Sequence, residues 1–289
     1  MTAAPLGFKR VVLGLHPNAP SRTANLAAEF ASLFDLELLG LFIEDVGLRN
    51  FAAMPFAREI SALGGGWRAI EPARAGRELD FAANDAERRF AAAARSLARR
   101  QFEIVRAAAG QALAAKLRSG DVVTIGAPAT PAERAAEPLA SLIDAAFRSA
   151  AAVMLAPTRP ARSAGPVVAM ATTPNDPSIA AAAAIAEAMG EKLIVVELTT
   201  PAGHAWLSTH RAGAPAADID GLPPDLHGLG ERLAVLSRGA AQDRLALAIA
   251  AARGVPTLSI DSREEKEEEE EGRSRRRRPR AADQSSVSR

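Results

Sequence analysis

Short apolar segments alternate with longer helical ones along the first 157 residues of the chain. The sequence indicates buried strands at 10–15 (RVVLGL), 36–43, 102–105, 121–125 and 152–156. It indicates helices between them, at 21–33, 78–100, 111–118 and 139–148. Strands that alternate with helices in this way form a parallel sheet with helices on both faces. This part of the chain is therefore expected to be α/β and doubly wound.

The sequence supports more specific predictions for the segment 44–77 and for the helix at 78–100 that follows it. The helix at 78–100 is expected to place Phe81, Phe90 and Leu97 on one buried side and to turn its arginines toward water. The segment 44–77 before it contains two prolines and three consecutive glycines, which are typical of loops. We therefore expect a loop-rich excursion between the second strand and this helix.

A shift of 156 residues lays the opening of the chain over a later part. The shift pairs Val11 with Val167 and Pro20 with Asp176, and it keeps a strand–helix–strand register without a gap for about 35 residues. Further elements are indicated at 232–236, 242–252 and 255–260, while the segment 201–230 is rich in Pro and Gly and is expected to be irregular. The sequence thus predicts a second, shorter unit of the same kind.

Length and charge divide the chain into three parts. At roughly 150 residues per domain, a chain of 289 residues suggests about two domains, which we expect at 1–160 and 161–261. Residues 262–289 contain a block of glutamates and then a block of arginines, which predicts a disordered charged tail. Contact with nucleic acid is expected only there and only weakly, through Arg275, Arg276, Arg277 and Arg278.

The composition excludes several classes of function. The chain has no cysteine, so disulfides, thiolate catalysis and Cys-ligated zinc or iron–sulfur sites are excluded. Lys plus Arg number 35 and Asp plus Glu 34, a balance that argues against a dedicated nucleic-acid or membrane-surface protein. The apolar run after Arg10 stops at His16, and the longest apolar run, 179–186, is far too short to span a bilayer. We therefore expect a soluble, cytoplasmic protein without a targeting segment.

The order and spacing of these elements resemble the universal stress protein family in tandem form. The resemblance rests on RVVLGLHPNAPSRTANLAAEFASLFDLELLGLFIED at 10–45, DVVTIGAP at 121–128 and ASLIDAAFRSAAAVMLAP at 140–157, and extends more loosely over 165–261. It implies two doubly wound parallel-sheet domains of universal stress protein (adenine nucleotide α-hydrolase-like) type, with strand order 3-2-1-4-5 and a truncated second domain. It also implies an intrachain pseudo-dimer of the two domains, paired through their final strands so that a sheet edge is covered. A homo-oligomer of the chain is compatible with this arrangement.

In nucleotide-binding members of this family, a loop with the pattern G-x-x-G-x9-G-[ST] follows the fourth strand and cradles phosphates. Laid on this sequence, the pattern falls on Gly126, Ala129, Leu139 and Ala140, so two of the three glycines and the hydroxyl residue are absent. The prolines at 128 and 131 remove N–H donors, and the glutamates at 133 and 137 add negative charge. Because the sequence departs from the family pattern at these positions, we expect that the first unit does not bind ATP in the family manner.

The same comparison applies to the first strand of each unit. His16 stands where the family has an aspartate, and in the second unit Thr172 takes that place while Ser237 replaces the first glycine of the loop. The candidate ligand-binding residues are His16, Asn18, Gly126, Ala127, Ala129, Leu139 and Ala140. No catalytic residue, metal site or cofactor is assigned. If the protein does bind a cofactor, the alternative is ATP or another adenine nucleotide.

Three classes of function stay open. The first is a degenerate stress protein that acts through ligand or partner binding in a stress-associated or regulatory role. The second is a nucleotide-binding stress protein with a variant loop after the fourth strand. The third is an enzyme related to the adenine-nucleotide α-hydrolases. The glycine losses favour the first class over the second, and the third lacks a recognisable nucleophile, metal cluster or acid–base pair.

Overall fold

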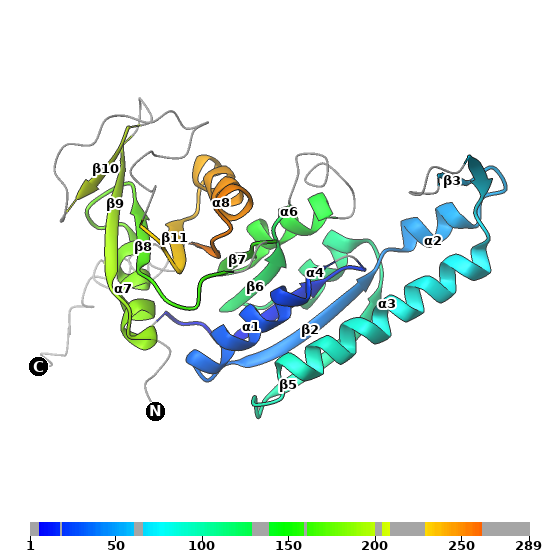
Figure 1. Ribbon diagram of the computed structural model, residues 1–289, viewed down its shortest axis with the longest axis horizontal. Helices are drawn as coiled ribbons and strands as arrows, with labels where there is room; N and C mark the ends of the chain where they lie inside the picture. Colours follow the sequence, from blue (N-terminus) through cyan, green and yellow to red (C-terminus); the bar gives the residue numbers. More distant parts are fainter. Residues whose placement is uncertain are drawn as a thin grey trace, which may run out of the picture.

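Ten strands of the protein lie side by side in one sheet (Figure 1). The computed structural model describes residues 6–17, 19–60, 66–128, 139–158, 161–199, 204–208 and 229–261. The strands of the first half are β1 (Arg10–Leu15), β2 (Glu37–Glu44), β5 (Arg100–Arg106), β6 (Asp121–Gly126) and β7 (Ala152–Ala156). Those of the second half are β8 (Val167–Ala171), β9 (Leu193–Thr199), β10 (His204–Ser208), β11 (Leu233–Ser237) and β12 (Thr257–Ile260). Their order across the sheet is β10-β9-β8-β11-β12-β7-β6-β1-β2-β5.

The first half has the strand order predicted from the sequence. Its strands lie in the order β5-β2-β1-β6-β7, and all four neighbouring pairs are parallel, which confirms the order 3-2-1-4-5. The first strand and the helix α1 (Ser21–Leu33) also have the predicted bounds. All six residues of β1 are buried, as expected of a central strand covered on both faces.

The second half repeats this order with one change at its outer edge. β9, β8, β11 and β12 are parallel, but β10 pairs antiparallel to β9 at the position where the first half has the parallel strand β5. The helix α7 (Pro177–Met189) lies 156 residues after α1 at both of its ends, so the offset in the sequence is kept in the structure. β10 is a regular strand inside the segment 201–230, which was predicted to be irregular. The charged tail predicted at 262–289 lies outside the described residues.

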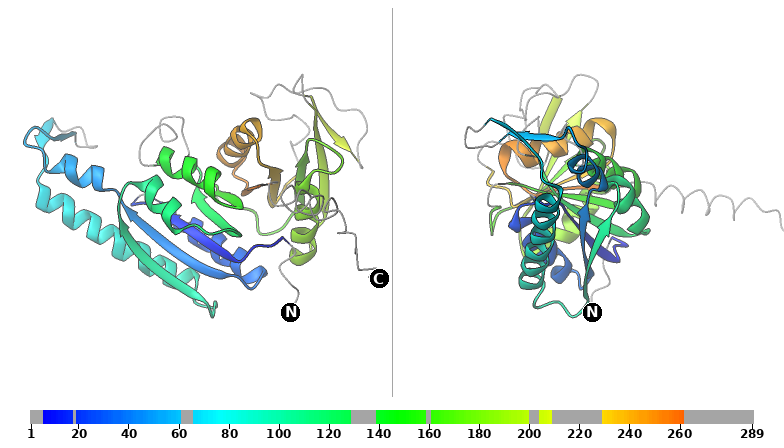
Figure 2. Two further views of the ribbon diagram at one scale, coloured as in Figure 1. Left: turned by 180° about the vertical axis from the view of Figure 1, so that it is seen from behind. Right: turned by 90° about the vertical axis from the view of Figure 1, so that its right-hand side faces the viewer.

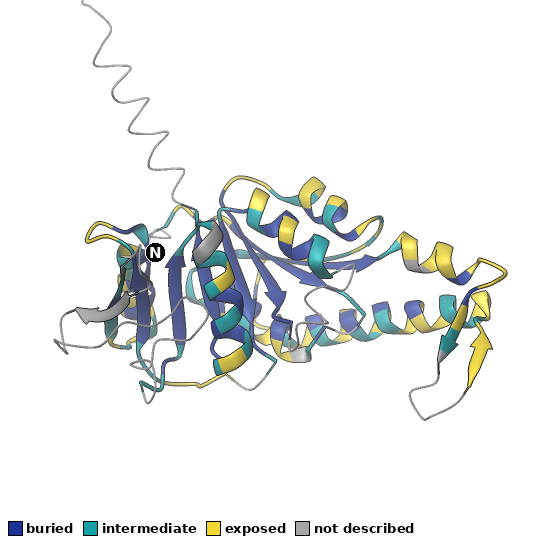
Figure 3. Ribbon diagram, turned by 90° about the horizontal axis from the view of Figure 1, so that it is seen from above, coloured by how far each residue is buried: buried dark blue, intermediate teal, exposed yellow. Residues whose placement is uncertain are grey.

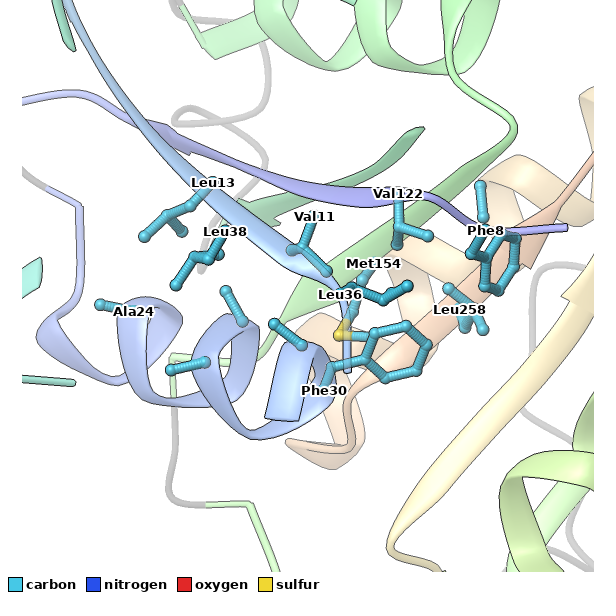
Figure 4. Close-up of a cluster of buried hydrophobic side chains, with 14 of the residues drawn as sticks. Phe8, Val11, Leu13, Ala24, Phe30, Leu36, Leu38, Val122, Met154 and Leu258 are labelled. Carbon is cyan, nitrogen blue, oxygen red and sulfur yellow. The ribbon is translucent and has the colours of Figure 1, made fainter. Parts of the chain in front are cut away.

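Helices cover both faces of the sheet (Figure 2). The helices α1, α7 and α3 (Pro72–Ala93) pack on one face, and α4 (Ala109–Lys116), α6 (Leu139–Ser149) and α8 (Ala240–Arg253) pack on the other. Successive residues of β1 alternate between the two resulting cores, with Val11 in one and Val12 in the other. Figure 4 shows part of the first core, where side chains from α1, β7 and β12 lie in one cluster. This core therefore continues from the first half of the chain into the second.

The two halves meet at β7 and β12, which pair antiparallel. The backbone N–H of Asp261 donates to the carbonyl of Ala151 at 2.8 Å, and Arg238 Nη1 donates to the carbonyl of Ala150 at 2.8 Å. On the face of the sheet that α1 covers, Arg232 of the second half forms an ion pair with Glu29 of α1. Backbone and side-chain contacts thus join the halves into one continuous sheet.

The long helix differs from its prediction in both position and buried face. It spans residues 72–93 rather than 78–100, because Pro72 begins it and the chain turns after Ala93. Phe90 is 3% exposed and Leu97 is buried beyond the helix end, but Phe81 is 69% exposed, so its predicted burial was wrong. The buried positions of α3 are Leu79, Ala83, Ala86 and Phe90. In the part of the chain that the structure describes, no helix has the length and hydropathy that a bilayer span requires.

The excursion after β2 contains regular structure that the sequence did not reveal. The helix α2 (Val46–Ala52) begins at a cap formed by Asp45, whose Oδ1 accepts from the N–H of Gly47 at 2.6 Å. The strands β3 (Arg58–Ile60) and β4 (Trp67–Ala69) then form a separate antiparallel hairpin. With the first turns of α3, these elements project from the body of the molecule (Figure 3). We call the described residues of 46–81 the arm.

Candidate ligand site at the carboxyl ends of β1 and β6

The sheet of the first half changes direction between β1 and β6. From β1 the chain crosses through α1 to β2 on one side, and from β6 it crosses through α6 to β7 on the other. In open α/β sheets, ligands bind in the crevice at such a point, beyond the carboxyl ends of the strands. Here His16 follows β1 and Gly126 ends β6, so these two predicted residues do lie at the switch point. Asn18 and Ala129 lie outside the described residues.

The contact between Gly126 and the start of α1 narrows this crevice. A Cβ placed on Gly126 would lie 3.2 Å from Pro20 Cδ and 3.6 Å from Thr23 Oγ1. Pro20 is the residue that precedes α1, and it supplies no side-chain hydrogen bond to the helix N-terminus. The Pro20 ring therefore packs where a ligand would approach the glycine.

The space beside His16 is small. The cavity lined by Leu15, His16, Pro20 and Arg89, among others, has a volume of about 10 Å³. Arg89 Nη1 reaches across from α3 and donates to the carbonyl of Ala19 at 3.2 Å. A cavity of this size holds at most about one water molecule, whereas small-molecule sites enclose about 300–1,000 Å³. The described residues around His16 thus form a closed crevice.

The backbone after Gly126 also differs from a phosphate-binding loop. The N–H of Ala127 donates to the carbonyl of Ala156 at 2.7 Å, and Pro128 has no N–H to offer. Both residues are buried. Leu139 and Ala140 lie in the first turn of α6, where they offer no side-chain hydroxyl. The described residues here therefore offer a phosphate no free N–H from Ala127 or Pro128 and no side-chain hydroxyl from Leu139 or Ala140.

In the second half, a carboxylate of the chain itself fills the equivalent position. Asp176 is 4% exposed and precedes α7, at the position that the 156-residue shift pairs with Pro20. Its Oδ2 accepts from the N–H and the hydroxyl of Thr172, at 2.8 and 2.9 Å, and its Oδ1 accepts from the N–H of Ser178 at 3.0 Å. The hydroxyl of Ser237, at the end of β11, also donates to Oδ1. Asp176 thus connects the carboxyl ends of β8 and β11.

The hydrogen bonds around Asp176 determine its ionisation. Burial alone would raise the pKa of this carboxyl group, but the hydrogen bonds from Ser237, Thr172 and Ser178 outweigh it and hold the pKa below its usual value. The sequence comparison singled out Thr172 and Ser237 but assigned no role to Asp176. Its position before Pro177, which is a typical helix start, was the signal that could have identified it.

A larger groove lies between α4 and α6, on the other face of the sheet. It has a volume of about 420 Å³ and is lined by Gly110, Gln111, Ala114, Ser141, Ala145 and Arg148, among others. The two helices are in close contact, since a Cβ on Gly110 would lie 2.7 Å from the carbonyl oxygen of Ser141. Small side chains therefore keep the groove open, and its charged rim residue Arg148 pairs with Asp144 at 4.0 Å.

The described residues contain no group of three or more His, Asp or Glu side chains that could hold a metal ion. The side chains of His204, in β10, and of His210 and His227 lie outside the described part of the structure. Among the described residues, the space beside His16 is therefore a small crevice, and the groove between α4 and α6 is much larger.

The chain is similar to several solved structures. A universal stress protein from Archaeoglobus fulgidus has a TM-score of 0.55 and 8% identity, with 89% of this chain and 98% of that chain covered. A functionally unknown protein from Pseudomonas aeruginosa has a TM-score of 0.49 and 14% identity, covering 94% and 100%. A universal stress protein solved in complex with cAMP has a TM-score of 0.33 and 18% identity, covering 53% and 99%. No protein-family model and no curated protein matches the sequence. The likeness to the Archaeoglobus fulgidus protein shows that the chain has the fold of the universal stress proteins.

Proposed function

We propose that the protein is a non-catalytic, universal stress protein-like protein that acts through ligand or partner binding in a stress-associated or regulatory role. We further propose that neither half binds ATP in the manner of the nucleotide-binding members of that family. The observation that carries this proposal is the packing of Pro20 on Gly126 at the switch point.

Three features support the absence of family-type nucleotide binding. The cavity beside His16 measures about 10 Å³. The N–H of Ala127, which a phosphate-binding loop would leave free, donates to Ala156. In the second half, the ionised Asp176 lies at the equivalent position, and its negative charge would repel a phosphate. A nucleotide-binding crevice needs space, free hydrogen-bond donors and positive potential, and each of these features removes one of them.

The groove between α4 and α6 supports partner binding in place of nucleotide binding. Its volume of about 420 Å³ is in the range of ligand sites. Its lining combines glycine and alanine residues with five polar or charged ones, namely Asp45, Gln111, Ser141, Arg148 and Ser149. Such a groove fits a mixed polar and apolar surface element of a partner, and its one arginine is already paired with Asp144. The alternative function, an ATP-binding stress protein with a variant loop after β6, would instead place the ligand above Gly126.

Calorimetric titration of the full chain with Mg·ATP, paralleled by a fluorescent ATP analogue, tests the proposal. We expect no saturable binding at nucleotide concentrations up to about 1 mM, which corresponds to a binding free energy weaker than about 4 kcal/mol. Saturable binding in the low micromolar range that is lost in Gly126→Asp would contradict the proposal and establish the variant-loop alternative. Gly76→Asp is the matched control, because Gly76 has open space around it and lies on α3.

Native mass spectrometry of the protein purified from its own host provides an independent test. We expect the mass of the polypeptide without an adenine nucleotide. A co-purified ligand of another mass would identify the chemistry that the protein recognises. A co-purified adenylate would contradict the proposal even if the titration showed no exchange.

A further inference from the structure

The arm carries nearly all of the exposed large hydrophobic side chains of the described chain. Six of these seven residues are on the arm: Val46, Phe51, Met54, Phe56, Trp67 and Phe81. The seventh is Ile104, on the edge strand β5. Phe56, Trp67 and Phe81 are each about two-thirds exposed, at 72%, 66% and 69%. Single exposed apolar residues are common on protein surfaces, but a concentration of this kind marks an interaction surface.

The two faces of the hairpin at the end of the arm differ, because one carries an ion pair and the other carries Trp67. Glu59 and Arg68 are directly opposite each other in the register, and Arg68 Nε donates to Glu59 Oε1 at 2.6 Å. Arg74 of α3 lies 3.8 Å from the same Glu59 oxygen, so this polar face is turned toward α3. Because successive side chains of a strand point to opposite faces, Trp67 stands on the other face, away from α3, where Arg58 and Ala69 also lie. A two-stranded hairpin is marginally stable alone, so covering Trp67 would stabilise it.

The base of the arm is held in a fixed position by a buried carboxylate. Glu44, at the end of β2, is 2% exposed and forms ion pairs with Arg49 of α2 and with Arg106 of β5, whose Nε lies 3.0 Å from Glu44 Oε2. Both arginines also lie 3.9 Å from Asp80 of α3. These contacts join α2, α3 and the sheet, so the apolar surface of the arm is presented by a rigid base rather than by a loose loop. Rigid presentation lowers the entropy cost of binding.

We propose that the arm is a dimerisation surface and that its partner is the arm of a second copy of this chain. A fully covered aromatic side chain buries about 150–250 Å². At their observed exposures, the four aromatic residues of the arm leave about 400–600 Å² to be covered in each copy. Val46 and Met54 add to this area. A standard interface buries about 800 Å² per partner, so two arms supply most of what a stable dimer needs.

The charges of the arm also fit a second copy. Residues 46–81 contain five arginines and four acidic residues, and several of these charges are already paired within the arm. Two near-neutral surfaces do not repel each other, and a two-fold axis places each apolar patch on its equivalent. A nucleic acid or an anionic membrane would instead require a large excess of positive charge, whereas five arginines and four acidic residues give the arm a formal net charge of only +1.

Sedimentation velocity of the full chain between about 1 and 100 µM tests the proposal. We expect a concentration-dependent dimer, and we expect the double variant Phe56→Ser/Trp67→Ser to raise the dissociation constant at least tenfold, which is about 1.4 kcal/mol. Ile104→Ser is the matched control, because it removes the exposed hydrophobic residue outside the arm, and it should leave the constant unchanged. Circular dichroism and thermal unfolding check that each variant is folded.

Cross-linking provides a second readout that does not depend on the stability of a variant. The chain has no cysteine, so a single introduced cysteine reports one position only. Ala69→Cys, on the hairpin, should cross-link between copies with a short bismaleimide, whereas Ala252→Cys, exposed at the end of α8, should not. A wild-type chain that is monomeric at 100 µM, a dimer that Phe56→Ser/Trp67→Ser does not weaken, or cross-linking at Ala252 alone would overturn the proposal. A monomer that co-floats with phosphatidylcholine–phosphatidylglycerol vesicles would overturn it in favour of a membrane surface.

Discussion

Arg10 and Asp121 face each other across β1 and β6, and their side chains form a buried ion pair with 2.6 Å between Arg10 Nη2 and Asp121 Oδ2. A second contact of 3.1 Å joins Arg10 Nε to Asp121 Oδ1, so the pair is bidentate. The N–H of Arg118 donates to the same carboxylate at 2.7 Å, and Arg10 donates to the carbonyl of Lys116 at 2.9 Å. The pair lies at the amino ends of the strands, opposite the candidate ligand site, so its role is structural.

Asp121→Ala should lower the free energy of unfolding by about 3–5 kcal/mol, because it leaves the Arg10 guanidinium buried without its counter-charge. Urea denaturation followed by circular dichroism measures the change. Asp144→Ala is the control, since Asp144 and Arg148 form an exposed pair at 4.0 Å whose loss should cost less than about 1 kcal/mol. Equal, small effects of the two substitutions would contradict the buried-pair interpretation.

Asp176→Asn should lower the free energy of unfolding at pH 7 by about 2 kcal/mol, because the carboxylate accepts four hydrogen bonds that an amide cannot all replace. The pKa of Asp176 is lower in the folded protein than in the unfolded chain, so its stabilising contribution is present above the unfolded pKa, near 3.9, and is lost as the pH falls through the folded value.

Urea denaturation of both proteins at pH 7, 5 and 3 tests this dependence. The difference between the wild type and Asp176→Asn should be nearly constant from pH 7 to 5 and should shrink below about pH 4. A difference that persists unchanged at pH 3 would show that packing, not the ionised carboxylate, explains the loss.

Much of the fold could be predicted because local patterns and chain connectivity determine it. β1 and α1 have their predicted bounds, since a short apolar strand and an amphipathic helix are each visible in the sequence. The arm was missed because α2, β3 and β4 are too short to show a period, and because α2 packs on α3 while β3 and β4 pack on each other. Phe81 was misplaced because nine residues separate it from Phe90, which is two and a half helical turns, so the two rings lie on opposite sides.

The candidate site was predictable in position but not in shape. The strand ends placed His16 and Gly126 at the switch point, because connectivity alone fixes that point. The contact of Pro20 with Gly126 and the hydrogen bond from Ala127 to Ala156 join residues far apart in the sequence, so no local pattern could reveal them. Asp176 was visible as a residue but not as a connection between β8 and β11, because Ser237 lies 61 residues away.

Gly40→Ala should destabilise the protein by about 1–3 kcal/mol, because a Cβ on Gly40 would lie 2.7 Å from Phe90 Cδ2 and 2.8 Å from Phe102 Cδ2. Phe90 is buried in the core, and the half-buried ring of Phe102 packs against it with 5.4 Å between the ring centroids, so the rings have little room to move aside. Gly76→Ala is the matched control with the opposite sign. Gly76 lies within α3 with open space around it, so alanine should stabilise the helix by about 0.5–1 kcal/mol. Thermal unfolding of the two variants should therefore shift in opposite directions, and a loss of stability in both would contradict the prediction.

Asp243→Asn should leave the protein at least as stable as the wild type at pH 7, in contrast to Asp176→Asn. Burial raises the pKa of Asp243, and the negative charge of Asp261 raises it further. The hydrogen bonds from Gly239 and Ser259 and the attraction of Arg238 lower the pKa, but their combined effect is smaller. The ionised form of Asp243 is therefore disfavoured in the folded state. The contribution of this group to the free energy of unfolding is fully present below the unfolded pKa, near 3.9, and is lost as the pH rises through the folded pKa. An asparagine keeps an Oδ1 that can accept from Gly239 and Ser259, at 3.4 and 3.2 Å, without the buried charge. Urea denaturation at pH 7 and pH 3 should show the advantage of the variant at pH 7 only, and a variant clearly less stable than the wild type at pH 7 would show that the charge itself stabilises the junction.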